Sequence, residues 1–202
     1  MTLFGITLAF TLLLAALGSA MIIHSILGKR RIVTDFRRVS ERIGGTVSQS
    51  TVFAFPQVRG RYDGRDASVF FHIAKGEKAS IIYLVYTLSA RAATTIFLAK
   101  DKYFKPVNDP TKLSREVGEV VPGLDGRYQI RAADAARAGR LFQDGEIRNH
   151  LDGLETFPSL MLGPDSLIAG KPFEGPEDTA PESMLNHFRA LGKVAATLET
   201  VA

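Results

Sequence analysis

The chain begins with an apolar run that no charged side chain interrupts. Residues 3–27 are apolar or small apart from His24, and the first basic residue is Lys29. An α-helix needs roughly 20 such residues to cross a bilayer, at about 1.5 Å per residue. The run therefore predicts a transmembrane anchor over residues 1–28. A cleaved signal peptide is the alternative, but no basic residue precedes the run, which continues beyond the small residues at 18–20.

After the anchor, the apolar positions first take helical spacing and then alternate. Residues 32–43 carry apolar side chains at helical spacing, and a Gly-Gly pair ends the pattern. We expect a basic amphipathic helix at 29–44 that lies on the membrane surface or supports the domain against it. Alternation with a period of two then predicts strands, and the Asp63-Gly64 turn predicts that the first two form a hairpin. The predicted strands are 53–62, 65–74, 80–88, 93–99 and, after a long connection, 127–131.

The second half of the chain mixes helical and strand patterns. Residues 132–154 are helical with a break at Asp144, which can cap a second segment. Residues 157–169 predict a late hairpin, and residues 179–198 predict the clearest helix. Short connections favour an antiparallel meander over parallel βαβ units. The predicted fold class is α+β: an N-terminal single transmembrane helix, then one domain, 45–202, whose mainly antiparallel β-sheet is packed by a C-terminal helix.

The positive charge of the chain is concentrated beside the predicted anchor. Residues 29–42 contain six basic and two acidic side chains, a net charge of +4 that equals the formal net charge of the whole chain. Basic flanks remain on the cytoplasmic side, so we expect the N-terminus outside and the C-terminal domain in the cytoplasm. The positive charge of residues 29–42 would interact favourably with anionic lipid headgroups. Because residues 43–202 have no net charge, we predict no nucleic-acid binding. The flanking residues are Lys29, Arg30, Arg31, Arg37, Arg38 and Arg42.

Small residues recur every four positions within the predicted anchor. This spacing lets a second helix approach closely, although Gly and Ala are common in membrane spans generally. We therefore expect the span to contact other membrane protein subunits. The small residues are Gly5, Ala9, Ala15, Ser19, Ala16 and Ala20. A place in the headgroup layer accounts for His24 better than a role as a ligand inside the membrane.

The rest of the chain carries no recognised catalytic, cofactor or metal signature. The chain has no cysteine, which excludes thiolate metal sites and thiol nucleophiles and fits a reducing compartment. His72, His150 and His187 lie far apart in the sequence, and we expect each in a surface or ordinary hydrogen-bonded position. We therefore predict no enzyme activity, no cofactor and no metal. The alternative is an enzyme with an unrecognised site on the long connection 100–126.

Arginines cluster around the predicted hairpin turn. Arg59 and Arg61 share one face of the first strand, and Arg65 lies just across the turn. Such a basic face can bind phosphate, acidic lipid or the carboxylates of a partner. A solvated face, with the neighbouring aspartates as counter-charges, is the simpler interpretation.

These patterns support two functional hypotheses. The first is a single-pass, membrane-anchored, non-enzymatic interaction protein, such as an accessory or scaffolding subunit of a membrane complex. It is based on the span at 3–27, the basic flank and the lack of catalytic signatures. The second is a domain that binds lipid or a small ligand at the membrane surface, because a sheet covered by a helix can enclose an apolar cavity.

Overall fold

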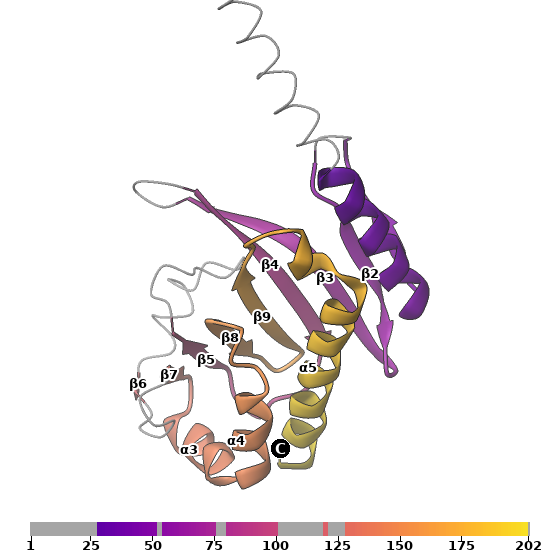
Figure 1. Ribbon diagram of the computed structural model, residues 1–202. Coiled ribbons are helices and arrows are strands. Elements are labelled where there is room, and N and C mark those ends of the chain that lie inside the picture. Colours follow the sequence, from indigo (N-terminus) through magenta and orange to yellow (C-terminus); the bar gives the residue numbers. More distant parts are fainter. Residues whose placement is uncertain (1–27, 52–53, 76–79, 101–118, 121–127, 202) are drawn as a thin grey trace, which may run out of the picture.

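One antiparallel sheet organises the domain, and helices cover one of its faces (Figure 1). The computed structural model describes residues 28–51, 54–75, 80–100, 119–120 and 128–201. Within these residues, nine strands pair in the order β1-β2-β3-β4-β9-β8-β5-β7-β6. The strands are β1 (Thr46–Ser48), β2 (Gln57–Tyr62), β3 (Arg65–Lys75), β4 (Ser80–Ser89), β5 (Ile96–Ala99), β6 (Glu119–Val120), β7 (Gln129–Ala132), β8 (Ser159–Leu162) and β9 (Ser166–Pro172).

The helices lie on the same side of this sheet (Figure 1). Residues 28–42 are helical and form the N-terminal helix of the described chain. Asp144 ends one helix and caps the next, accepting a hydrogen bond from the backbone N–H of Glu146 at 2.7 Å, as the sequence predicted. The other helices are α3 (Ala135–Gln143), α4 (Gly145–Asp152), a 3₁₀ turn η1 (Pro176–Thr179) and α5 (Pro181–Val201). The predicted α+β class, antiparallel sheet and C-terminal helix are therefore confirmed.

The hairpin of β2 and β3 forms where the sequence predicted it. Asp63 and Gly64 both have positive φ angles, 49° and 76°, which a two-residue type I′ turn requires at both central positions. The turn sets the register, in which Tyr62 lies opposite Arg65 and Val58 opposite Val69. Apolar side chains of both strands therefore reach the helix-covered face together.

The predicted meander is wrong beyond β4. β4 pairs with β3 on one side and with β9 on the other, and β5 lies between β8 and β7 instead. The late hairpin of β8 and β9 thus enters the sheet between two strands that are consecutive in the sequence. β4 has apolar residues on both faces, which suits this central position but does not specify which strand lies beside it.

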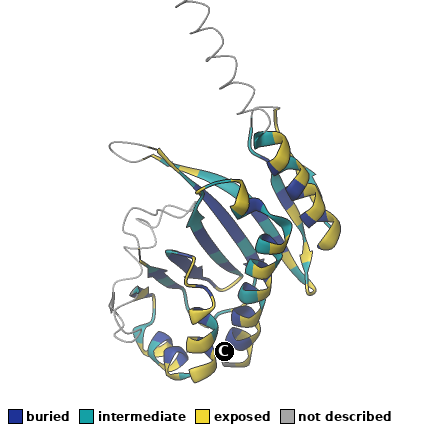
Figure 2. Ribbon diagram, viewed as in Figure 1, coloured by how far each residue is buried: buried dark blue, intermediate teal, exposed yellow. Residues whose placement is uncertain are grey.

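The core lies between the helices and one face of the sheet (Figure 2). The α5 stripe supplies Met184, Phe188, Leu191, Val194 and Leu198, all at most 1% exposed. Phe188 stacks on Tyr62 with ring centroids 5.7 Å apart and meets the Tyr86 ring edge-on at 5.4 Å. This spacing was visible in the sequence as the clearest helical stripe, and the prediction that it packs on one sheet face is confirmed.

The N-terminal helix belongs to the same core. Its apolar residues Ile32, Phe36, Val39 and Ile43 are buried against the sheet, and Phe36 stacks on Phe71 of β3 at 5.6 Å. Because this apolar face is already occupied, it is not available to lie on a membrane. The structure therefore favours the alternative in which the helix supports the domain.

The helix ends at a glycine in the left-handed region. Gly44 has a φ of +57°, and the backbone N–H of Gly45 donates to the Ser40 carbonyl at 2.7 Å. The chain then turns back beside β2, where a Cβ on Gly45 would lie 2.3 Å from the Arg59 carbonyl oxygen. The Gly-Gly pair of the sequence is thus explained by a helix end followed by a close backbone approach.

The predicted anchor over residues 1–28 lies almost entirely outside the described residues, as do the small residues of its packing face and His24. Among the described residues, no helix combines the length and the hydropathy that a membrane span needs. The anchor and its orientation therefore stay predictions.

Replacing Phe36 tests whether the N-terminal helix is part of the folding unit. We expect Phe36→Ala to lower the free energy of unfolding by about 3–5 kcal/mol, because a fully buried ring is lost from a packed core. Urea unfolding followed by circular dichroism measures the effect. Arg37→Ala, an exposed neighbour on the same helix, is the control and should be nearly neutral. A near-neutral Phe36→Ala would show that the helix is dispensable for the domain.

Candidate functional site

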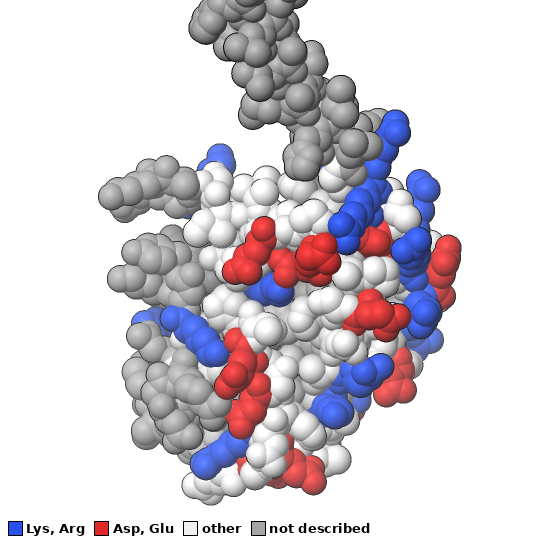
Figure 3. Space-filling model, viewed as in Figure 1, with Lys and Arg blue, Asp and Glu red and all other residues white. Residues whose placement is uncertain are grey.

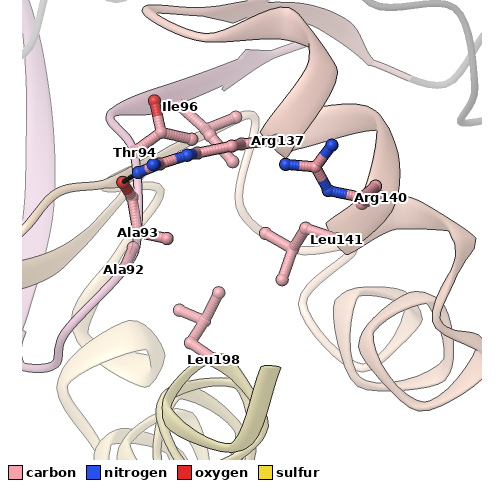
Figure 4. A pocket seen from close by; sticks show the side chains of 8 residues that line it. All are labelled: Ala92, Ala93, Thr94, Ile96, Arg137, Arg140, Leu141 and Leu198. Atoms are coloured by element: carbon pink, nitrogen blue, oxygen red, sulfur yellow. Dashed lines mark hydrogen bonds between the residues drawn. The ribbon is translucent and has the colours of Figure 1, made fainter. Parts of the chain in front are cut away.

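A cleft of about 330 Å³ opens at the end of the domain where α5 finishes (Figure 4). It lies between α3, α5 and the connection from β4 to β5. We call it the arginine cleft, because its polar lining is dominated by two arginines. It is lined by Ala92, Ala93, Thr94, Ile96, Arg137, Arg140, Leu141 and Leu198.

Arg137 is held in place at the start of α3. Asp134 caps this helix by accepting a hydrogen bond from the Arg137 backbone N–H at 2.9 Å, and its carboxylate lies 3.4 Å from Arg137 Nε. The side chain then extends across the cleft and donates from Nη1 to the Ala93 carbonyl at 3.2 Å (Figure 4). The cap and the backbone contact together fix one cation at the mouth of the cleft.

Arg140 lies one helical turn later and points into the same cleft (Figure 4). Within the described residues its guanidinium has no ion pair comparable to that of Arg137 with Asp134. Below both arginines the floor is apolar and buried, with Ile96, Leu141 and Leu198 each at most 9% exposed. Two guanidinium groups above an apolar floor suit a ligand with an acidic head and a hydrocarbon body.

A second polar group lies beneath α5, inside the core. Tyr86 of β4 is fully buried, and its hydroxyl lies 3.1 Å from Nδ1 of His187 on α5. Nearby, Lys171 Nζ donates to the carboxylate of Asp178, and both side chains are 13% exposed. The second Asp178 oxygen accepts from the Glu174 backbone N–H at 2.7 Å. These four side chains, Tyr86, Lys171, Asp178 and His187, form the buried polar cluster.

Burial sets the protonation states in this cluster. It lowers the pKa of His187 to about 4, with a further decrease caused by the Lys171 charge, and it raises the pKa of Tyr86. Burial also opposes ionisation of Asp178, but hydrogen bonds from Lys171 and from the Glu174 backbone outweigh it, so the pKa of Asp178 is lowered. A neutral imidazole can thus accept a hydrogen bond from the Tyr86 hydroxyl, next to the ion pair of Lys171 and Asp178. The cluster satisfies its own polar groups, and we assign it a structural role.

The arginines of the predicted basic face separate in the structure. Arg59 and Arg61 lie on β2 with their side chains on the sheet face opposite the helices, and Arg61 Nε is 3.7 Å from Asp66. Arg65 lies on the other face, where its guanidinium binds both carboxylate oxygens of Glu199 on α5. The hydrogen bond between the two side chains raises the pKa of Arg65 and lowers the pKa of Glu199.

An open groove of about 760 Å³ runs beside Arg59 on the uncovered face. Ser68 of β3 and Thr87 of β4 share a hydrogen bond of 2.7 Å across it, and Asp66 and Asp165 line its sides. The groove is therefore polar, with charges of both signs.

The cations that the sequence predicts to flank a membrane lie along the N-terminal helix (Figure 3). Two of them pair with acids of neighbouring elements: Arg31 with Glu177 of η1 at 3.0 Å, and Arg42 with Glu182 of α5 at 3.7 Å. Lys29 lies over the Phe55 ring at 5.9 Å. The others, Arg30, Arg37 and Arg38, are exposed.

The other candidate residues of the sequence do not come together. His150 lies 3.2 Å from the Thr197 hydroxyl, His72 lies on the uncovered face of β3, and only His187 joins a polar cluster. The described residues hold no group of three or more metal-ligating side chains. The connection 100–126, the alternative enzyme site, lies almost entirely outside the described residues.

No sequence signal indicated the arginine cleft, because its lining comes from three separate segments.

The buried imidazole makes the stability of the domain sensitive to pH. An unfolded histidine titrates near pH 6.5 but His187 only near 4, so between these values the unfolded chain binds a proton that the folded chain does not. We therefore expect the free energy of unfolding to fall as the pH is lowered through this window. Urea midpoints at about pH 7.5 and about pH 4.5 measure the change. The decrease in the free energy of unfolding should be smaller in His187→Gln than in the natural chain and should persist in His72→Gln. Equal decreases in the natural chain and both variants would contradict the assignment to His187.

Comparison with known proteins places the fold. No protein-family model and no curated protein matches the chain. A solved structure that it resembles is the crystal structure of the mycobacterial trehalose monomycolate transport factor A, TtfA. The TM-score is 0.53 at 13% sequence identity, and the match covers 81% of this chain and 94% of that chain. At this identity the likeness establishes a shared fold for the domain.

Proposed function

We propose that this chain is a membrane-anchored, non-enzymatic accessory protein of a membrane transport complex. The observation that carries the proposal is the shared fold, which extends over almost the whole length of a protein described as a transport factor. The comparison supports a shared fold, and the function is our proposal, because one fold can host many functions. The following features of the chain support it.

The N-terminal helix supports a fixed placement of the domain beside a membrane. Its four apolar residues are buried in the domain core, so the helix and the sheet are one rigid unit. The proposed anchor precedes the first described residue of that helix. A domain held in this way would present the same surface to a neighbouring subunit each time, with the C-terminal domain in the cytoplasm as the basic flank predicts.

The uncovered sheet face supplies a surface for such a subunit. Arg59 and Arg61 project from it beside an open polar groove, while the opposite face is filled by helices. A partner segment with carboxylates matches these cations, and charge complementarity would determine which partner binds and in which orientation.

Co-purification tests the accessory role. We expect the full chain, extracted in mild detergent, to carry a membrane protein partner that native mass measurement detects. Reversing both charges with Arg59→Glu and Arg61→Glu should remove most of that partner, because like charges would then face each other. Lys193→Glu, an exposed change on α5, is the matched control and should retain it. A strictly monomeric chain, or a partner that survives the double reversal, would count against this surface.

A second candidate function is binding of an acidic amphiphile in the arginine cleft. The observation that favours it is the pair of guanidinium groups above the buried floor of Ile96, Leu141 and Leu198. An alkyl phosphate or a fatty acid has the matching chemistry, with an anion for the arginines and a chain for the floor.

Titration with dodecyl phosphate and with dodecanoate tests this function. We expect Arg140→Glu to weaken binding by about tenfold or more, since a charge-assisted hydrogen bond is worth roughly 1.5–3 kcal/mol. Ala93→Trp should also weaken it, because the added ring would fill the mouth of the cleft. Arg131→Glu, an exposed arginine on β7, is the matched control for net charge. Equal affinities in all four proteins would exclude the cleft as the site.

A further inference from the structure

Several elements end at the side of the domain where the N-terminal helix starts (Figure 1). β3 and β9 finish there, and β2, β4 and α5 begin there, as the antiparallel registers require. The first described residue, Gly28, lies at this end. On the proposed function, the membrane therefore lies beside this end, and the arginine cleft lies at the far end of α5 (Figures 1 and 4).

The hairpin of β3 and β4 projects beyond the rest of the sheet at this end (Figure 1). The pairing of β2 with β3 reaches only as far as Val69, and the pairing of β9 with β4 begins only at Tyr83. Past these positions the two strands pair with each other up to Lys75 opposite Ser80, and one further backbone hydrogen bond runs from the Phe173 N–H to the Ile82 carbonyl at 2.8 Å. We call this two-stranded part, residues 73–75 and 80–82, the projecting ribbon. A ribbon of two strands is marginally stable in water by itself.

The projecting ribbon carries exposed isoleucines on both faces. Ile73 is 52% exposed and Ile81 38% exposed, and these two are the large apolar residues that the described chain leaves most open to solvent. Ile73 lies opposite Ile82 in the register, and Ile81 lies opposite Ala74. Side chains alternate along a strand, so Ile73 and Ile81 point to opposite faces. A ribbon with exposed apolar side chains on both faces is better matched by lipid, which can surround it, than by a protein partner that covers one face.

Half-buried aromatic rings continue this apolar surface towards the N-terminal helix. Phe55 stacks on Phe71 at 4.3 Å, and Phe173 meets Phe71 edge-on at 5.1 Å. Phe71 lies on the same face of β3 as Ile73, two residues earlier. The cation of Lys29 lies over the Phe55 ring at 5.9 Å. Aromatic rings beside basic side chains are typical of the zone where a protein meets lipid headgroups.

The charges at this end are compatible with a lipid surface. Lys75 is exposed at the end of β3, and Lys29 and Arg30 lie at the start of the N-terminal helix. Acids are also present at this end: Glu177 of η1 is paired with Arg31 of the N-terminal helix at 3.0 Å, and Glu174, which follows β9, is exposed. The ribbon itself has a basic residue and no acid among its described positions.

We propose that the projecting ribbon inserts into the headgroup layer of the membrane to which the chain is anchored. The insertion rests on the proposed function, because the anchor determines which end of the domain faces the lipid. The depth is shallow: apart from the Ile82 carbonyl, the backbone groups along the outer edges of the described ribbon lie outside any strand pairing. Such groups need water or headgroups as partners, which excludes the hydrocarbon centre. Ile73 and Ile81 then reach the upper acyl chains from two sides, and Lys75 contacts the headgroups.

A single-cysteine depth measurement tests this, because the natural chain contains no cysteine. Ile73→Cys and Ile81→Cys, each in the full chain, are labelled with an environment-sensitive fluorophore and reconstituted into phosphatidylcholine–phosphatidylglycerol vesicles. We expect blue-shifted emission that lipids with a doxyl group on the acyl chain quench strongly. Gln143→Cys, exposed at the end of α3 on the far side of the domain, is the control and should remain unquenched.

A second pair of variants separates insertion from mere proximity. With the label at Lys75→Cys, the double change Ile73→Ser and Ile81→Ser should abolish quenching, while Ile73→Leu with Ile81→Leu should retain it. Quenching that is equal in both pairs would overturn the proposal, as would labels at 73 and 81 that stay as solvent-exposed as the label at 143. If these labels stay exposed in a chain that alkaline carbonate fails to extract, insertion is wrong but the anchored accessory role stands. A chain that carbonate extracts would overturn both.

Discussion

Burial of one face of the sheet holds the helices and the strands of this domain together. The N-terminal helix and α5 place their apolar stripes on this face, α3 packs beside β7 and α4 packs against α5, and their side chains form one continuous core. Hydrophobic burial is the main favourable term in folding. The buried apolar side chains come from segments far apart in the sequence, among them the N-terminal helix and α5. The opposite face carries the polar groove, the two arginines of β2 and a small second apolar cluster around the buried Tyr83 and Val85 of β4.

This one-sided arrangement explains where each candidate site lies. The buried polar cluster sits under α5 because β9 ends beneath that helix with Lys171 on the covered face, where Asp178 reaches it. The arginine cleft opens where the cover is incomplete, between α3 and the end of α5. The projecting ribbon extends past the cover altogether, which is why its isoleucines are exposed. The proposed contacts with lipid, ligand and partner thus use three different parts of the molecule.

Local patterns predicted most of the elements but not their neighbours. The Asp63-Gly64 turn, the Asp144 cap and the stripe of α5 each depend on residues close in sequence, and each was visible there. The position of β9 between β4 and β8 was not, because many apolar strands can pair with β4 equally well by pattern alone. The basic face predicted from the sequence also placed Arg65 with Arg59 and Arg61, whereas the fold separates them. The turn lies between them, and α5 offers Glu199 to Arg65 on the covered face.

The α+β class, the two hairpins, the Asp144 cap and the concentration of positive charge in residues 29–42 could all be predicted from the amino-acid sequence. These follow from spacing, turn chemistry and charge, which act over a few residues. Three features became visible in the folded chain alone: the N-terminal helix packs into the core, Tyr86 contacts His187, and Arg137 and Arg140 share a cleft with Leu198. Those contacts join segments far apart in the chain, and their geometry depends on strand order and helix placement, which no local pattern encodes.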